Sequence, residues 1–228
     1  MAAPGKPENS TAGLDARLAG LHVDPGRPLL ICDADEVLFT FMDCFERHLH
    51  DHGAVFNWAS YRLNGNILSQ ATGEPLDVPA VGDLIGRFFD LHTRSIPAVK
   101  GAAEALRALS GRLQIVILSN VPRHRKADRA WALRKHGMDF PLVANEGPKG
   151  EAVALLAART EAPVFFVDDA PSHHADVARL AERVQRIHFV CHPRLGPLVG
   201  PAEACDTRAL SWAEIRAYIE AGLDREGY

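Results

Sequence analysis

Apolar segments of strand length alternate with segments of helical pattern over most of the chain. The apolar segments are rich in Val, Ile, Leu and Phe, and they lie at residues 28–32, 113–118, 162–167 and 184–190, with a weaker one at 141–145. They lack strict polar alternation, which is typical of strands covered on both faces. Ala- and Leu-rich segments with helical spacing lie between them, at residues 98–111, 124–137, 150–160 and 170–183. This alternation predicts an α/β fold, a Rossmann-like three-layer core with a parallel sheet.

The interval from residue 41 to residue 95 interrupts the alternation. It contains two helical patterns, FMDCFERHLHDHG and PAVGDLIGRFFDLH, a polar stretch between them, and no convincing strand. A connection this long is uncommon inside a compact domain unless it has structure of its own. We therefore expect a small helical cap at 41–95, inserted into a core formed by residues 28–40 and 96–228. Residues 1–27 are expected to form a loose N-terminal arm with a short helix over LDARLAGL.

Composition and charge narrow the class of partner. The chain of 228 residues has a formal net charge of -4 at pH 7 and a sequence pI of about 6.2, which disfavours nucleic acid and anionic membranes as partners. The N-terminus has no apolar leader, and no apolar run approaches the roughly 18 residues of a membrane span. The four cysteines lack zinc-type spacing. These features predict a cytoplasmic protein with reduced thiols and a small-molecule partner.

The C-terminal segment SWAEIRAYIEAGL, residues 211–223, has the pattern of an amphipathic helix. Such a helix can pack on the sheet or support a homodimer, and the sequence favours neither arrangement.

Polar residues follow three of the apolar segments directly. Because the carboxyl ends of parallel strands meet at one edge of a sheet, where ligands bind, we expect these side chains to gather there. A lysine at the start of the helical pattern before the third of these segments should join them. The set consists of Asp33, Asp35, Ser119, Asn120, Lys149, Asp168 and Asp169. Carboxylates that converge on one edge repel one another, and a bound Mg²⁺ would relieve that repulsion.

These residues resemble the four ordered motifs of the haloacid dehalogenase (HAD) superfamily of phosphohydrolases. The motifs are Asp-x-Asp in DADEVL, the Ser after IVIL, the Lys in GPKG and the acidic pair after FFV. The segment IPAVKGAAEALRAL is similar to the family's Pro-x-x-x-Gly helix before the second motif. The likeness runs from about residue 28 to residue 190.

The resemblance implies a Mg²⁺-dependent phosphomonoester hydrolase that acts on a small phosphorylated metabolite. Asp33 would attack phosphorus and become an aspartyl phosphate, and Asp35 would protonate the leaving oxygen and then activate water. Ser119, Asn120 and Lys149 would bind the phosphoryl group.

The metal ligands implied by the resemblance are Asp33, the backbone carbonyl of Asp35, and the pair Asp168 and Asp169. The sequence does not decide which member of the pair contacts the metal. A phosphotransferase or mutase on the same scaffold is the alternative enzyme. A catalytically silent module that binds a phosphorylated ligand is the alternative from another class.

The sequence departs from the family pattern at two places. Glu36 and Val37 replace the usual Gly-Thr, so a residue with a Cβ must form a turn that often uses glycine. His173 lies where many members carry a further Asp, and it would contact the metal ligands or take no part.

The cap is expected to select the substrate, because the four motifs recognise only phosphate and metal. Arg62, Asn64 and Arg123 are the candidate residues, and Asn66, His124 and Arg125 lie nearby in the sequence. The alternative is that they are ordinary surface residues.

Overall fold

The computed structural model describes residues 11–228, so the first ten residues of the predicted arm lie outside the described part. Its core is a six-stranded sheet in the order β5-β4-β1-β6-β7-β8, and every neighbouring pair is parallel. The strands are β1 (Leu29–Cys32), β4 (Gln114–Ser119), β5 (Leu142–Ala144), β6 (Val164–Asp168), β7 (Gln185–Phe189) and β8 (Thr207–Ala209). The predicted α/β fold class is confirmed. The edge strand β8 was not predicted, because three residues with one buried side chain give no apolar run.

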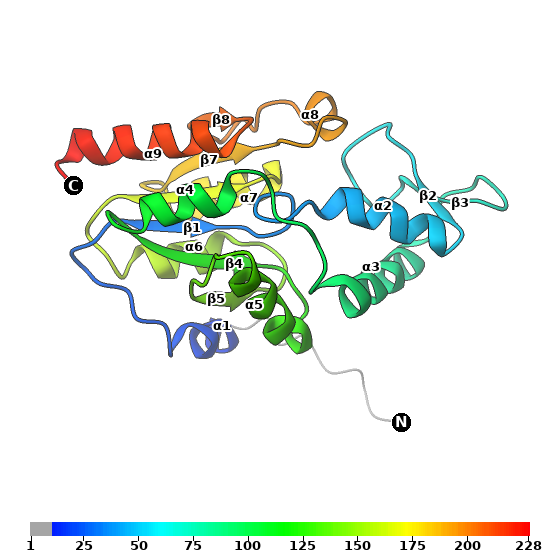
Figure 1. Cartoon of the computed structure of the whole chain (residues 1–228), viewed down its shortest axis with the longest axis horizontal. Coiled ribbons are helices and arrows are strands. Elements are labelled where there is room, and N and C mark those ends of the chain that lie inside the picture. Colours follow the sequence, from blue (N-terminus) through cyan, green and yellow to red (C-terminus); the bar gives the residue numbers. More distant parts are fainter. Residues whose placement is uncertain (1–10) are drawn as a thin grey trace.

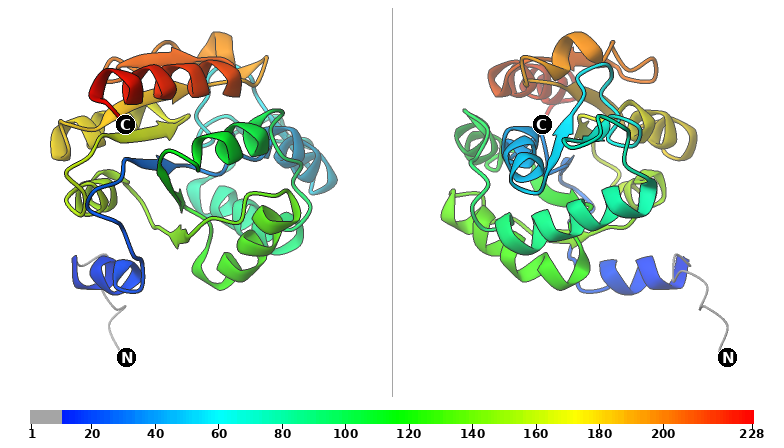
Figure 2. Two further views of the ribbon diagram at one scale, coloured as in Figure 1. Left: turned by 60° about the vertical axis from the view of Figure 1, so that its left-hand side comes forward. Right: turned by 90° about the vertical axis from the view of Figure 1, so that its right-hand side faces the viewer.

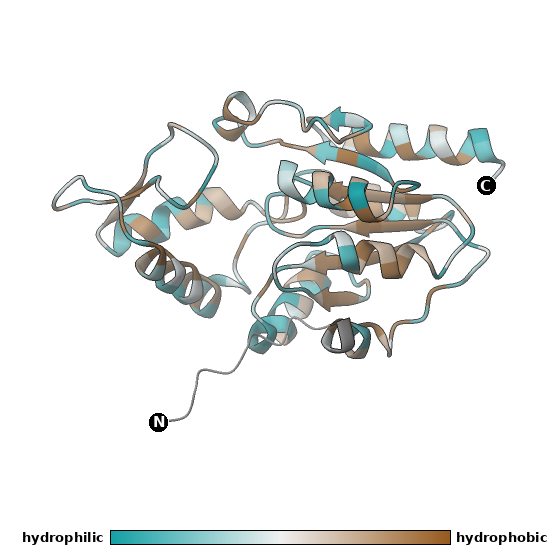
Figure 3. Cartoon of the chain, turned by 180° about the vertical axis from the view of Figure 1, so that it is seen from behind, coloured by the Kyte–Doolittle hydropathy of each residue, from teal (hydrophilic) through white to brown (hydrophobic). Residues whose placement is uncertain are grey.

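Helices cover both faces of the sheet (Figure 1). One face carries α1 (Thr11–Leu18), α6 (Gly150–Ala157) and α7 (Pro171–Leu180), and the other carries α4 (Ala102–Leu109), α5 (Lys126–Lys135) and α9 (Trp212–Glu226). The central strands between them are predominantly hydrophobic in Figure 3, as strands buried on both faces must be. The C-terminal amphipathic segment, α9, therefore packs on the sheet, which is the first of the two arrangements considered from the sequence.

The described part of the N-terminal arm is ordered against the core rather than loose. Leu14 and Leu18 of α1 are buried against the sheet and α6. Arg159 donates hydrogen bonds to the carbonyl oxygens of Leu18 and Leu21, both at 2.9 Å. Within residues 11–228, no helix has the length and apolar character needed to cross a membrane.

The interval after β1 forms a lobe at the carboxyl end of the sheet (Figures 1 and 2). It contains α2 (Phe41–Asp51), β2 (Ala54–Phe56), β3 (Ile67–Ser69) and α3 (Val78–His92). The antiparallel pair β2–β3 was not expected, because strands of three residues leave no readable pattern. Phe41, Phe45 and Phe88 form its centre, with ring centroids 4.9 to 5.3 Å apart. We call this lobe the cap, and we propose residues 41–95 as its boundaries.

Two short helices complete the fold. A 3-10 helix, η1 (Arg123–Arg125), links β4 to α5, and α8 (Leu195–Leu198) follows β7. Both lie beside the cap: His124 and Arg125 of η1 contact Asp90 of α3, and α8 lies near the cap in Figure 1.

Candidate active site

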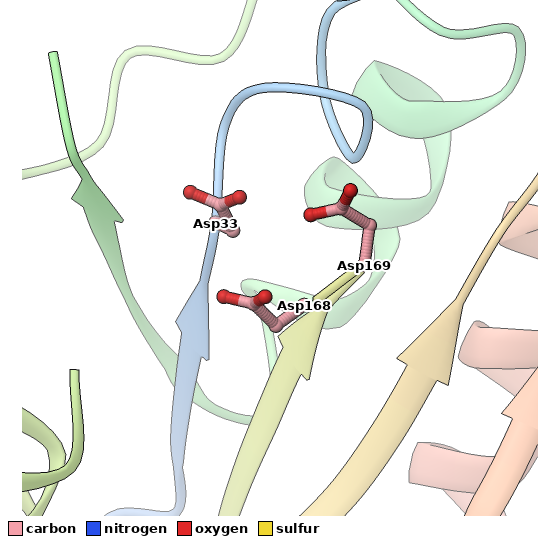
Figure 4. A group of neighbouring side chains, drawn as sticks. All are labelled: Asp33, Asp168 and Asp169. Carbon is pink, nitrogen blue, oxygen red and sulfur yellow. The ribbon is translucent and has the colours of Figure 1, made fainter. Parts of the chain in front are cut away.

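Three carboxylates meet where β1 and β6 end (Figure 4). Cys32 pairs with Val167 in the parallel register, so the residues that follow, Asp33 and Asp168, stand level on adjacent strands. Asp169 is the first residue after the end of β6. One oxygen from each carboxylate lies within 4.8 Å of the others. The sequence prediction that these residues gather at one edge agrees with this geometry.

Lys149 lies between two of these carboxylates. Its Nζ is 2.5 Å from Asp33 Oδ1 and donates a hydrogen bond of 2.8 Å to Asp168 Oδ2. Burial alone would lower the pKa of Lys149, but the charges of Asp168 and Asp33 outweigh burial and raise it. The lysine therefore stays charged in a site from which water is largely excluded.

One lysine does not balance the three acids. Burial raises the pKa of Asp33 to about 6, and Lys149 offsets this only in part. Burial, and then the charges of Asp168 and Asp33, raise the pKa of Asp169 well above its usual value. For Asp168 burial is the largest single effect and raises the pKa, but the charge of Lys149 and the charge and hydrogen bond of His173 together outweigh it, so the pKa is lowered. A hard divalent cation beside these oxygens would remove the remaining repulsion, so the donor set fits Mg²⁺.

The two members of the acidic pair differ in their surroundings. Asp168 is fully buried, and besides Lys149 it accepts hydrogen bonds from the backbone N–H of Ala170 at 2.9 Å and contacts His173 Nδ1 at 3.0 Å. The Asp169 carboxylate is half-buried and accepts no hydrogen bond from the described residues. Asp168 thus orients Lys149 and His173, whereas Asp169 keeps its oxygens available to a ligand.

Ser119, the last residue of β4, and Asn120, which follows it, have different roles. Ser119 is fully buried at the end of the strand, and its Oγ accepts the N–H of Val121 at 3.2 Å, which leaves the hydroxyl proton for another acceptor. The Asn120 side chain donates to Gly147 O at 3.0 Å and accepts from Asn145 at 2.9 Å. Asn120 therefore holds the loop before Lys149, and its amide is not directed to the carboxylates.

Asp35 has a buried partner that the sequence did not reveal. Arg129 of α5 is fully buried, and its Nη2 donates to Asp35 Oδ1 at 2.6 Å. The guanidinium lies 4.7 Å from the ring centroid of Phe39 and 5.9 Å from that of Phe89, a residue of the cap. The burial of Arg129 could have been predicted from the sequence, because it lies four residues before Leu133 and so on the same, buried face of the predicted helix.

The turn after Asp35 has the conformation expected for glycine. Glu36 has φ 61, and it is the only described residue other than glycine with a positive φ. Its Oε1 accepts the backbone N–H of Met42 at 2.5 Å, in the first turn of α2. Burial raises the pKa of Glu36 to about 7. The departure from the family pattern thus has a local use, because the carboxylate caps a helix whose Thr40 side chain makes no capping bond.

A cavity of about 320 Å³ opens from the carboxylates toward the cap. It is lined by Asp33, Asp35, Glu36, Phe41, Met42, Tyr61, Arg62, Leu63, Asp169, Ala170, Val190, Leu195 and Val199. Of the three substrate candidates, Arg62 lines it, and Asn64 and Arg123 do not. The core segment from Val190 to Val199 was missed as a cavity wall, because nothing in its sequence indicates that it faces the cap.

The neighbouring candidates have structural partners. Asn66 is buried and donates to Ser60 Oγ at 2.6 Å and to Arg62 O at 2.7 Å. His124 Nε2 and Arg125 Nε both contact Asp90 Oδ1 of the cap at 2.8 Å. These contacts order the cap loop and link the cap to the core.

Comparison with solved structures identifies the fold. A HAD family hydrolase from Deinococcus radiodurans, with bound phosphate and sodium, is 22% identical over 88% of this chain and 98% of its own, with a TM-score of 0.58. A predicted phosphoglycolate phosphatase from Haemophilus somnus is 12% identical over 87% and 100%, with a TM-score of 0.59. A haloacid dehalogenase-like hydrolase from Streptococcus pneumoniae is 12% identical over 85% and 98%, with a TM-score of 0.56.

No family model matches the sequence, and no curated protein matches it. The solved structures nevertheless confirm the fold that the resemblance implied: the chain has the fold of the HAD-like hydrolases.

Proposed function

We propose that the protein is a Mg²⁺-dependent phosphomonoester hydrolase that forms an aspartyl phosphate on Asp33. The observation that carries this proposal is the convergence of Asp33, Lys149 and the acidic pair at the open end of the sheet, with Asp35 two residues further on. A module that only binds a phosphorylated ligand has no use for a second carboxylate beside the first.

The first step is attack on phosphorus. Lys149 holds Oδ1 of Asp33, and no described residue donates a hydrogen bond to its second oxygen, which is therefore the attacking atom. The Asp33–phosphorus bond forms as the bond to the ester oxygen breaks, and Asp35 gives its proton to that leaving oxygen. Lys149 and the Ser119 hydroxyl stabilise the charge on the transferring phosphoryl group.

The second step restores the enzyme. Asp35, now a carboxylate, takes a proton from water, and the hydroxide attacks the phosphorus of the aspartyl phosphate. Inorganic phosphate leaves, and Asp33 is regenerated as a carboxylate. Arg129 keeps Asp35 at the mouth of the site in both steps.

Mg²⁺ would be held by Asp33, Asp169 and the backbone carbonyl of Asp35. Asp168 would lie next to these ligands and contact Lys149 and His173. Bound there, the ion would screen the negative phosphate from the carboxylates and withdraw charge from its oxygens. The Deinococcus protein, which has the same fold, binds phosphate and sodium, and this supports a phosphorylated ligand for this chain.

The test is hydrolysis of an aryl phosphate in Mg²⁺ and in chelator, combined with mass spectrometry of acid-quenched enzyme. Wild type should require Mg²⁺ and yield a phosphorylated peptide that contains Asp33. Asp33→Asn should abolish both signals, and Asp35→Asn should lower turnover by roughly 10²–10⁴-fold. Asp83→Asn, an exposed change on α3, is the matched control and should behave as wild type.

Three results would contradict the proposal. Activity that survives Asp33→Asn would exclude the aspartyl phosphate. A wild type that binds phosphate but hydrolyses no ester would favour the silent module. Transfer to an added alcohol in preference to water would identify the phosphotransferase instead.

A further inference from the structure

The cavity above the carboxylates has a composition that restricts the group attached to the phosphate. Resting on the proposed function, we propose that the substrate is the phosphate ester of a small apolar hydroxy acid. Its phosphoryl group would face Asp33, its apolar chain would fill the cavity, and its carboxylate would pair with Arg62.

The size of the cavity sets the first limit. At about 320 Å³ it lies at the lower end of the range for small-molecule sites, which is roughly 300–1,000 Å³. Its floor is formed by Asp33, Asp35 and Asp169, so any organic group in it is attached to a phosphate at those residues. The volume therefore favours a small organic group on the phosphate.

The walls set the second limit. Three segments supply apolar side chains: the start of α2, the cap loop before β3, and the core segment after β7. These side chains are Phe41, Met42, Tyr61, Leu63, Val190, Leu195 and Val199. Apart from the acidic floor, the polar side-chain groups among the lining residues are the Glu36 carboxyl group, the Tyr61 hydroxyl and the Arg62 guanidinium.

A polyhydroxylated substrate is disfavoured by these walls. A sugar hydroxyl buried without a partner is destabilised, and the walls offer too few donors and acceptors for several hydroxyls. Methylene or aryl groups need no partner there and are stabilised by their removal from water. The wall chemistry therefore selects an apolar chain rather than a sugar.

Arg62 sets the third limit. It is the only basic residue among those that line the cavity in the described structure. Its loop is held in place, since Asn66 donates to Arg62 O at 2.7 Å and accepts the N–H of Asn57 at 2.6 Å through its own carbonyl. No carboxylate of the described residues forms an ion pair with the guanidinium. The backbone of Arg62 is thus held in place, and its exposed guanidinium is available to an anion on the ligand.

A carboxylate fits this cation better than a second phosphate. One guanidinium balances a single negative charge and pairs with a carboxylate through two parallel hydrogen bonds. A second phosphate would bring about two charges into a cavity that already holds the carboxyl groups of Asp35 and Glu36. Repulsion would oppose that ligand.

The experiment compares kcat/KM for four phosphate esters of primary alcohols. They are the phosphate of 6-hydroxyhexanoic acid, hexyl phosphate, the bisphosphate of 1,6-hexanediol, and glucose 6-phosphate. Because the leaving groups are alike, differences report on the cavity. The hydroxyhexanoic acid ester should be preferred over hexyl phosphate by roughly tenfold or more, the worth of a charge-assisted hydrogen bond. Hexyl phosphate should in turn exceed glucose 6-phosphate.

Arg62→Met tests the cation. The ratio of kcat/KM for the acid ester to kcat/KM for hexyl phosphate should fall to near one. Arg87→Met, an exposed change on α3, is the matched control and should keep the wild-type ratio. Leu195→Asn should shift the preference from hexyl phosphate toward glucose 6-phosphate.

Each contrary result has its own meaning. Preference for glucose 6-phosphate would overturn the apolar chain, and preference for the bisphosphate would overturn the carboxylate, while both leave the proposed hydrolase intact. An unchanged ratio in Arg62→Met would overturn the role of Arg62. If wild type hydrolyses none of these esters and no aryl phosphate in a manner that depends on Asp33, the proposed function itself fails.

Discussion

At the scale of single residues, the ion pair of Arg129 and Asp35 links the proposed acid to the cap. The guanidinium holds Asp35 with one nitrogen, while its Nε and Nη1 are buried without hydrogen-bond partners among the described residues. Its planar face rests on Phe39 and Phe89. Lysine could supply the charge but not the stacked plane. We therefore regard Arg129 as a positioning residue for Asp35.

The first prediction concerns Arg129→Met, which should reduce turnover according to the leaving group. An alkyl ester needs a proton on its leaving oxygen, so its kcat should fall roughly tenfold or more. A nitrophenolate leaves without a proton, so kcat for p-nitrophenyl phosphate should fall by much less. Steady-state kinetics on both esters measures this, and Arg129→Lys should lose less than Arg129→Met. An equal loss on both esters would show that Arg129 does not act through protonation of the leaving oxygen.

Glu36 combines an unfavourable backbone conformation with a favourable contact. A side chain at φ 61 costs about 1 kcal/mol or more relative to glycine. The hydrogen bond from Met42 to its carboxylate caps α2, and a cap contributes typically about 1 kcal/mol. The two effects are of similar size and opposite sign.

The second prediction separates them. Glu36→Ala should lose the cap and keep the strain, so its free energy of unfolding should fall by about 1–2 kcal/mol. Glu36→Gly should lose both and stay within about 1 kcal/mol of wild type. Denaturant unfolding of the three proteins measures the difference. If the glycine variant were no more stable than the alanine variant, the turn would not be strained.

At the scale of elements, one set of side chains joins the cap to the core beside the cavity. We call this set, Glu46 and Trp58 of the cap with His192 and Arg194 of the core, the clasp. The Arg194 guanidinium lies 3.9 Å from the Trp58 ring centroid and donates to Glu46 Oε1 at 2.9 Å. The rings of Trp58 and His192 are stacked at 5.2 Å. The clasp therefore holds the cap loop against the segment that carries Leu195.

The third prediction is that the clasp weakens in acid. Hydrogen bonds, above all from Arg194 and then from Trp58, lower the pKa of Glu46. A lowered pKa stabilises the clasp above the ordinary pKa of glutamate, about 4.3, and this contribution is lost as the pH falls through the lowered value. Because the pair is partly exposed, its contribution should not exceed about 1 kcal/mol.

The fluorescence of Trp58 measures this loss. Subtracting the signal of Trp58→Phe from that of wild type isolates it from Trp131 and Trp212. The difference should change below about pH 5, and Glu46→Gln should remove the change. A titration that persists in Glu46→Gln would assign the pH dependence to another group.

At the scale of the whole molecule, the sequence predicted the core better than the cap. Five of the strands coincide with predicted segments. Four of them, β1, β4, β6 and β7, have four to six residues, and the three-residue edge strand β5 lies in the weaker predicted segment 141–145. The pair β2–β3 and the edge strand β8 were missed, since these three-residue strands lie in no predicted apolar segment. Strand ends in a parallel sheet share one edge, so the positions of Asp33, Asp168 and Ser119 followed from the same pattern.

What sequence reasoning missed at the site depends on contacts between distant segments. Arg129 and Asp35 are 94 positions apart, and Glu46 and Arg194 are 148 positions apart. Nothing local to either member of a pair indicates its partner. The same holds for the cavity walls, which combine the start of α2, a cap loop and the segment after β7.

The last prediction concerns the stability of the entire fold. Burial, and after it the neighbouring carboxylates, raise the pKa values of Asp33 and Asp169 in the folded state, whereas the unfolded chain exposes and separates these groups. Mg²⁺ should bind only the folded state, and at about a hundred times its Kd it should add roughly 2.7 kcal/mol. For a domain of this size the melting temperature should rise by about 5–10 °C.

Asp169→Asn should reverse this pattern, because it removes a repelled charge and a proposed ligand together. Its melting temperature in chelator should exceed that of wild type, and Mg²⁺ should no longer raise it. Differential scanning calorimetry with and without Mg²⁺ measures both effects, and Asp83→Asn should retain the wild-type response. A variant that melts earlier in chelator yet still responds to Mg²⁺ would show that Asp169 stabilises the fold without binding the ion. The calorimetric signs thus separate a metal site from a structural carboxylate without any measurement of activity.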